Sequence, residues 1–97
     1  MLKIVKVRGD SMSPTLAPGD YMIVTKARAF RPGFVVLVDH PKYGSIVKRV
    51  KSVEDGQLNL EGDGAKSTST EAMGLVSPAA VEGRIRWAIT PKGIKRI

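Results

Sequence analysis

The sequence contains no cysteine, a single histidine and only five aromatic residues among its 97 positions. Without cysteine the chain has no disulfide, no thiolate metal site and no cysteine nucleophile. The one histidine, His40, and the scattered acids show none of the ligand spacings typical of metal sites. We therefore expect no metal and no other cofactor.

Long apolar runs are also missing. The longest is five residues, Phe34 to Val38, whereas a transmembrane helix needs about 20. The N-terminus lacks an apolar segment followed by a cleavage site, so no signal peptide is predicted. These absences predict a soluble, cytoplasmic protein without a membrane span. The length predicts one domain over residues 1–97, with a modest core.

Positive charge is abundant and unevenly distributed. The formal net charge is +7, and residues 84–97 contain five cations and no acid. Such a segment can bind nucleic acid or an acidic partner, or it can simply keep the surface solvated. Because the aromatic residues are not interleaved with cations as a stacking platform requires, we expect no nucleic-acid partner.

Short strands separated by glycine and proline turns dominate the hydrophobic pattern. Alternation predicts strands over residues 2–8, 20–26, 45–53, 57–61 and 82–90, and the apolar segment 34–39 predicts a strand buried on both faces. Ser77-Pro78 is typical of the start of a short helix. On the last strand, Ile85, Trp87 and Ile89 are expected to share one face. The pattern predicts a mainly β domain, either a partly open barrel or a sandwich of short strands.

A constrained turn joins the first two predicted strands and contains Ser11. Gly9 can adopt a positive φ or allow a close approach, and Pro14 restricts its own backbone and that of Ser13. Such a turn can hold a nucleophilic serine rigidly and leave it exposed. The same residues also suit an ordinary polar turn, so the assignment needs a partner elsewhere in the chain.

Lys48 is the candidate partner. On the predicted strand 45–53 it shares a face with Ile46 and Val50, so it is buried if these two face the core. Burial lowers the pKa of a lysine, and a neutral amine beside a serine hydroxyl is a general base. The alternative is that Lys48 lies at an edge and extends its ammonium to solvent. A triad of Ser11, His40 and an aspartate is a further formal possibility, although an ordinary loop position is the favoured explanation of His40.

Two segments together resemble the LexA-type and type I signal peptidases. The stretch Gly-Asp-Ser-Met-Ser-Pro-Thr-Leu, residues 9–16, resembles the serine box of that superfamily, and Ile-Val-Lys-Arg-Val, residues 46–50, resembles its lysine box. The resemblance implies a LexA/signal-peptidase-like β-fold and a serine endopeptidase with a Ser-Lys dyad. Ser11 would be the nucleophile and Lys48 the general base. The backbone N–H groups of Asp10 and Ser11 would form the oxyanion hole.

Departures from the family pattern limit what else the resemblance implies. The position two residues before the nucleophile, a serine in many signal peptidases, is Gly9, which favours the LexA-type arrangement. In the looser closing box, Ser69 would orient Lys48, with Thr68 as its rival. Met12 of the serine box would help to exclude water from Lys48. No membrane anchor and no DNA-binding domain precede Ser11, so the resemblance implies a minimal peptidase similar to the maturation peptidases of nickel superoxide dismutase.

The implied partner is a protein or peptide precursor that binds as an extended strand along a sheet edge. Two other classes stay open: a catalytically inactive peptidase-like binding module, and a small basic nucleic-acid-binding barrel that uses residues 84–96.

Overall fold

The computed structural model describes residues 1–64 and 73–97. Within these residues, seven strands and one 3₁₀ turn follow each other. The strands are β1 (Leu2–Lys6), β2 (Tyr21–Thr25), β3 (Val35–His40), β4 (Gly44–Glu54), β5 (Gln57–Glu61), β6 (Val81–Thr90) and β7 (Gly93–Arg96), and the turn is η1 (Pro78–Ala80). The prediction of a mainly β domain is confirmed.

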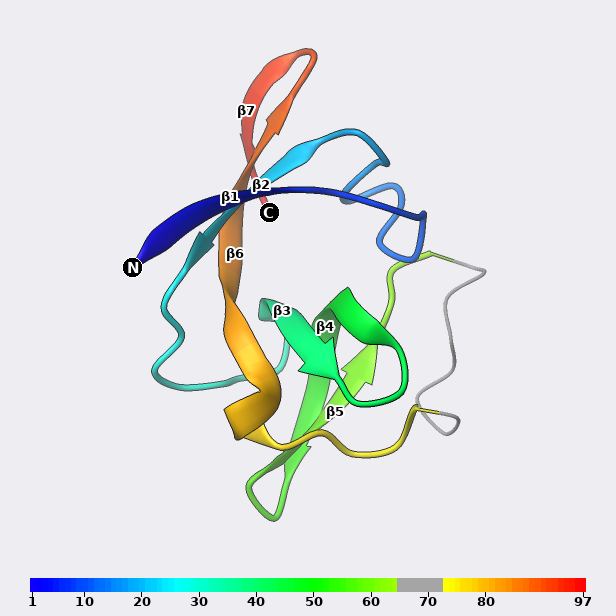
Figure 1. The fold of residues 1–97 in the computed structure, drawn as a ribbon, viewed down its shortest axis with the longest axis vertical. Helices are drawn as coiled ribbons and strands as arrows, with labels where there is room; N and C mark the ends of the chain where they lie inside the picture. The colour runs from blue at the N-terminus through cyan, green and yellow to red at the C-terminus, as the bar shows by residue number, and fades with distance from the viewer. Residues whose placement is uncertain (65–72) are drawn as a thin grey trace.

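All strand pairs are antiparallel and belong to one open sheet, in the order β1-β2-β6-β3-β4-β5. The long strand β6 pairs with β2 along one edge, and along its other edge first with β3 and then with β7. In Figure 1 β1, β2 and β7 gather around one end of β6, and β3, β4 and β5 lie at its other end. The described strands therefore do not form a sandwich of two separate sheets.

The strand β3 separates two hydrophobic clusters. Its side chains alternate, so that Val35 and Leu37 pack with β2 and β6, whereas Val36 and Val38 pack with β4 and β5. All four side chains are buried, which confirms the prediction of a strand buried on both faces. We call the β2–β6 side the first cluster and the β4–β5 side the second cluster.

A β-bulge in β6 changes the predicted pattern of its side chains. Ile23 pairs with Trp87 and Val24 with Ile85, so Arg86 is an extra residue without a partner in β2. The extra residue reverses the alternation: Ile85 is buried, whereas Trp87 is 44% exposed. The prediction that Ile85 and Trp87 share a face is therefore wrong, because simple alternation cannot anticipate a bulge.

The turns form as the sequence predicts, whereas the hydrophobic pattern does not predict the last strand. Asp55 and Gly56 both have positive φ, 50° and 77°, as a tight two-residue hairpin requires. Ser77 caps the predicted short helix, which is the 3₁₀ turn η1. Strand β7 was not predicted, because its four residues are all exposed and carry no buried alternation.

Candidate active site

The serine turn, residues 8–19, is a loop closed at its base and anchored in the core. Val7 donates its N–H to the carbonyl of Asp20 at 2.7 Å, and Gly19 donates to the carbonyl of Val7 at 3.0 Å. Met12 and Leu16 project from the loop into the first cluster and are almost fully buried. Two buried apolar side chains and a closed base fix the loop against the sheet.

Ser11 lies on the tightest part of this loop. Gly9 before it has φ +73°, in the left-handed region that favours glycine. After it, Ser13 donates its N–H to the carbonyl of Asp10 at 3.0 Å, which closes the turn around Ser11. Ser11 is partly exposed, and over residues 1–64 and 73–97 its hydroxyl has no hydrogen-bond partner. The hydroxyl is thus presented on a constrained backbone, as predicted from the sequence.

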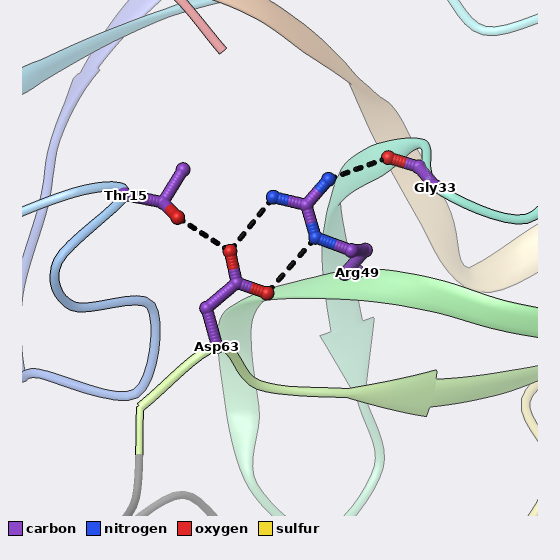
Figure 2. Close-up of polar contacts among 4 residues, drawn as sticks. All are labelled: Thr15, Gly33, Arg49 and Asp63. Atoms are coloured by element: carbon purple, nitrogen blue, oxygen red, sulfur yellow. Dashed lines mark hydrogen bonds and ion pairs between the residues drawn. The ribbon is translucent and has the colours of Figure 1, made fainter.

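A charged cluster ties this loop to β4. Asp63, just beyond β5, receives two hydrogen bonds from Arg49 of β4, at 2.9 Å from Nε and 2.7 Å from Nη2. The hydroxyl of Thr15 donates to the same carboxylate at 2.5 Å, and Arg49 Nη1 donates to the carbonyl of Gly33 at 2.8 Å. Figure 2 shows these four residues, which come from four separate segments, converging on one carboxylate and one guanidinium. We call this arrangement the Arg49–Asp63–Thr15 cluster.

Charge pairing is strong within this cluster. The hydrogen bonds from Arg49, assisted by Thr15, hold the pKa of the Asp63 carboxyl below its usual value. The same bonds raise the pKa of the Arg49 guanidinium. A two-pronged Arg–carboxylate contact fixes both position and orientation. It therefore holds the serine turn, through Thr15, in a defined place relative to the strand that carries Lys48.

Gly64 makes a second link to the turn. Its N–H donates to the carbonyl of Ser11 at 2.7 Å. A Cβ atom at this position would lie 2.5 Å from the carbonyl oxygen of Asp10, closer than real contacts allow. Glycine is therefore required for the backbone after β5 to approach the serine turn.

Lys48 is buried in the middle of β4. Only 3% of the residue is exposed, and it pairs with Val36 on the face that also carries Val50. Burial lowers the pKa of the Lys48 ammonium. Nowhere in the described segments does a hydrogen bond or an ion pair compensate its charge. The prediction that Lys48 enters the core with Val50 is confirmed, and the alternative of a solvent-exposed edge lysine is not.

A cavity of about 370 Å³ lies where the serine turn meets β4. It is lined by Ser11 and Met12 from the turn, by β1 and the residues that follow it, and by Ser45, Ile46 and Val47 of β4. Lys48 follows these three residues directly but is not among the lining residues. The structure thus brings Ser11 to the β4 segment, residues 45–47, that directly precedes Lys48.

His40 has a structural role at the end of β3. Its Nδ1 accepts hydrogen bonds from the backbone N–H groups of Lys42, at 3.0 Å, and Tyr43, at 3.2 Å. Its Nε2 therefore carries the proton and donates to the carbonyl of Met73 at 3.3 Å. With both ring nitrogens engaged by the backbone, His40 is poorly placed to act as a base.

Two of the predicted site residues belong to the part of the chain that the structure does not describe, and two residues of the site were not predicted. Ser69 and Thr68 fall outside the residues that the structure describes. The sequence patterns did not assign Arg49 and Asp63 to the site, although Asp63 is the centre of a Gly-Asp-Gly motif, residues 62–64, directly after a strand. In the described parts of the chain, no cluster of three or more His, Asp or Glu side chains is suited to a metal ion.

Comparison with known families agrees with this geometry. The family model described as Peptidase S24-like matches residues 1–74, about three quarters of the chain. The chain belongs to the Peptidase S24-like family. The match includes the serine turn, Lys48 and the Arg49–Asp63–Thr15 cluster, and it confirms the predicted relationship to the LexA-type peptidases. No curated protein and no solved structure matches the chain significantly. Within the described ranges, no helix has the length and apolarity to cross a membrane.

Proposed function

We propose that this S24-like domain is a serine endopeptidase that cleaves an extended segment of another protein chain, with Ser11 as nucleophile and Lys48 as general base. The observation that carries the proposal is the burial of Lys48: its charge has no partner in the described chain and its pKa is lowered. A buried, unpaired lysine is costly for a fold. Its presence on the strand beside a constrained serine turn is explained by chemistry that needs a neutral amine.

The reaction would proceed through an acyl-enzyme. The neutral Lys48 amine takes the proton of the Ser11 hydroxyl as its oxygen attacks the scissile carbonyl. The tetrahedral intermediate collapses, the peptide C–N bond breaks, and the Lys48 ammonium returns its proton to the leaving amine. Water, deprotonated by Lys48, then attacks the ester and releases the new carboxylate and the Ser11 hydroxyl.

The backbone N–H groups of Asp10 and Ser11 would stabilise the oxyanion. In residues 1–64 and 73–97 neither group donates to an acceptor of the protein. Both lie on the turn that Gly9 and the link from Gly64 hold in place. Preorganised donors of this kind contribute roughly 3 kcal/mol each to transition-state stabilisation in well-studied proteases.

The substrate would bind as a strand between two unpaired edges. Strand β1 pairs only with β2, so its outer edge has no partner among the described strands. Residues 44–48 of β4 pair with β3 alone, because β5 contacts only the second half of β4. Both edges border the cavity beside Ser11. An extended peptide can therefore hydrogen-bond to a strand edge while one side chain enters the cavity.

The decisive experiment combines unbiased substrate discovery with three variants. The protein is incubated with a pool of precursor proteins, and new N-termini are identified by mass spectrometry. We expect a defined set of products that disappears with Ser11→Ala and with Lys48→Met and persists with His40→Ala. The double variant should lose no more activity than either single variant, because nucleophile and base act as one unit.

The outcomes separate this proposal from its competitors. Cleavage that survives Lys48→Met but not His40→Ala would replace the dyad by a histidine mechanism. A complete lack of Ser11-dependent products would refute peptidase activity and favour a peptide-binding module. The pKa of Lys48, measured by NMR after reductive ¹³C-methylation, gives a test that needs no substrate, since an ordinary value would remove the proposed base.

A further inference from the structure

A second concavity lies on the sheet face away from the first cluster. Its volume is about 640 Å³, and its floor is formed by Ile23 and Thr25 of β2 and by Arg84 and Trp87 of β6. The segment between β2 and β3 also contributes to the lining. In Figure 1 this segment bends away from the sheet after β2 and returns to it at β3. The family match ends at residue 74, so β6 lies outside it. We call this concavity the basic pocket.

The lining of the basic pocket carries positive charge only. It contains the five cations Lys26, Arg28, Arg31, Arg84 and Arg86 and no acid. Four of the five are arginines, whose planar guanidinium groups match the geometry of phosphate oxygens. An anion is therefore the natural ligand of the pocket, and several cations in a row suit a polyanion better than a single ion.

Arg84 is one of these cations, and its guanidinium has a nitrogen without a hydrogen-bond acceptor in the described part of the protein. Its guanidinium carbon lies over the Phe34 ring, 3.3 Å from the ring centre. Its Nε is buried and has no acceptor in the described part of the protein. Burial, together with repulsion from Arg86 and Arg96, lowers the pKa of Arg84. A bound anion would relieve this repulsion.

Trp87 adds a flat aromatic surface to the same pocket. The bulge at Arg86 turns Trp87 outward, where it is 44% exposed and lies beside Ile23 of β2. Arg96 of β7 pairs with Trp87 of β6, and its guanidinium carbon lies 5.9 Å from the centre of the indole ring. An exposed indole flanked by arginines is the arrangement on which an unpaired base stacks.

We propose that the basic pocket binds single-stranded nucleic acid, with phosphates on the arginines and a base on Trp87. An acidic peptide would satisfy the charges but would leave the indole without a stacking partner. A membrane surface would meet the exposed apolar side chains of β1, but a flat bilayer cannot enter a concave wall built from cations. The proposal departs from the sequence-based expectation of no nucleic-acid partner. Arg84 and Arg86 are neighbours of Trp87 in the sequence, but only the pairing of β2 with β6 brings Lys26, Arg28 and Arg31 to the same pocket.

Trp87 is the only tryptophan of the chain and reports on the pocket directly. Its fluorescence is measured while a thymidine oligonucleotide of about 16 nucleotides is added, a length that covers the usual site sizes. We expect saturable quenching. Four phosphate contacts would weaken the affinity roughly 50-fold between about 50 and 200 mM salt.

Matched variants separate the pocket from general charge. Arg28→Ala with Arg31→Ala removes two pocket cations, whereas Lys42→Ala with Lys51→Ala removes two exposed cations outside it. Both double variants reduce the net charge from +7 to +5. We expect at least about tenfold weaker binding for the first pair, by loss of direct phosphate contacts, and less than about twofold for the second.

The aromatic contribution is tested with Trp87→Ala and a fluorescein-labelled oligonucleotide. Stacking of one base predicts a loss of about fivefold or more in affinity, with circular dichroism to confirm that the variant is folded. Parallel titrations use polyglutamate and vesicles of phosphatidylglycerol. Equal losses for both double variants, unchanged affinity for Trp87→Ala, or binding to polyglutamate or vesicles but not to the oligonucleotide would each overturn the proposal. The test does not depend on peptidase activity.

Discussion

Replacing Asp63 by asparagine removes the charge at the centre of the Arg49–Asp63–Thr15 cluster while keeping the shape of the side chain. The side chains of Arg49 and Asp63 are 27% and 18% exposed, so the pair is partly buried. An exposed ion pair is worth about 0–1 kcal/mol, whereas breaking a buried one costs about 3–5 kcal/mol. For this intermediate case we expect the free energy of unfolding to fall by about 2 kcal/mol.

Urea denaturation followed by circular dichroism measures this loss at pH 7. In a domain of this size, about 2 kcal/mol corresponds to a fall in Tm of roughly 8–16 °C. Asp39→Asn is the matched control, since Asp39 is exposed on β3 and undergoes the same chemical change. Its effect should stay within about 0.5 kcal/mol.

The pH dependence makes the test specific to the ion pair. Hydrogen bonds from Arg49 lower the pKa of Asp63 in the folded protein below the value of about 3.9 expected for the unfolded chain. The stabilisation is therefore fully present above about pH 4 and is lost as the pH falls through the lowered folded pKa. The difference between wild type and Asp63→Asn should shrink over that acidic range. A difference that is absent at pH 7, or that persists unchanged into acid, would refute the role assigned to the cluster.

Three further predictions concern single residues of the site. Lys48→Met should abolish cleavage without lowering stability at pH 7. Because the folded pKa of Lys48 is lowered, the free energy of unfolding of the wild type should rise with pH between that value and about 10.4. This rise should be absent in Lys48→Met, as urea titrations at several pH values would show. Gly64→Ala should lower the free energy of unfolding by about 1–3 kcal/mol through overpacking, and it should also reduce turnover per folded molecule. Gly83 is equally crowded but distant from the serine turn, so Gly83→Ala should reduce stability alone. His40→Ala should lower the free energy of unfolding by roughly 1–3 kcal/mol through loss of its backbone hydrogen bonds, which urea denaturation measures, and leave the specific activity largely intact; an inactive but folded variant would contradict this.

Local patterns in the sequence were sufficient to predict the main strands, the turns between them and the burial of Lys48. The alternation around Lys48 placed it on the face of Val50, and the unbroken apolar segment of β3 identified a strand that is buried on both sides. Asp55-Gly56 fixed a hairpin, because only a few residues tolerate positive φ at both central positions. Each of these features depends on residues that are neighbours in the chain, which is why the sequence determines them.

Contacts between distant segments could be known only from the tertiary structure. Thr15, Arg49 and Asp63 meet across separations of 14 and 48 residues, and nothing in their local sequence records which acid pairs with which base. The bulge at Arg86 is likewise a property of the pairing between β2 and β6, and it alone turns Trp87 out of the core and into the basic pocket. Strand register and long-range charge pairing are collective outcomes of packing the whole chain, so they become visible only once the sheet is assembled.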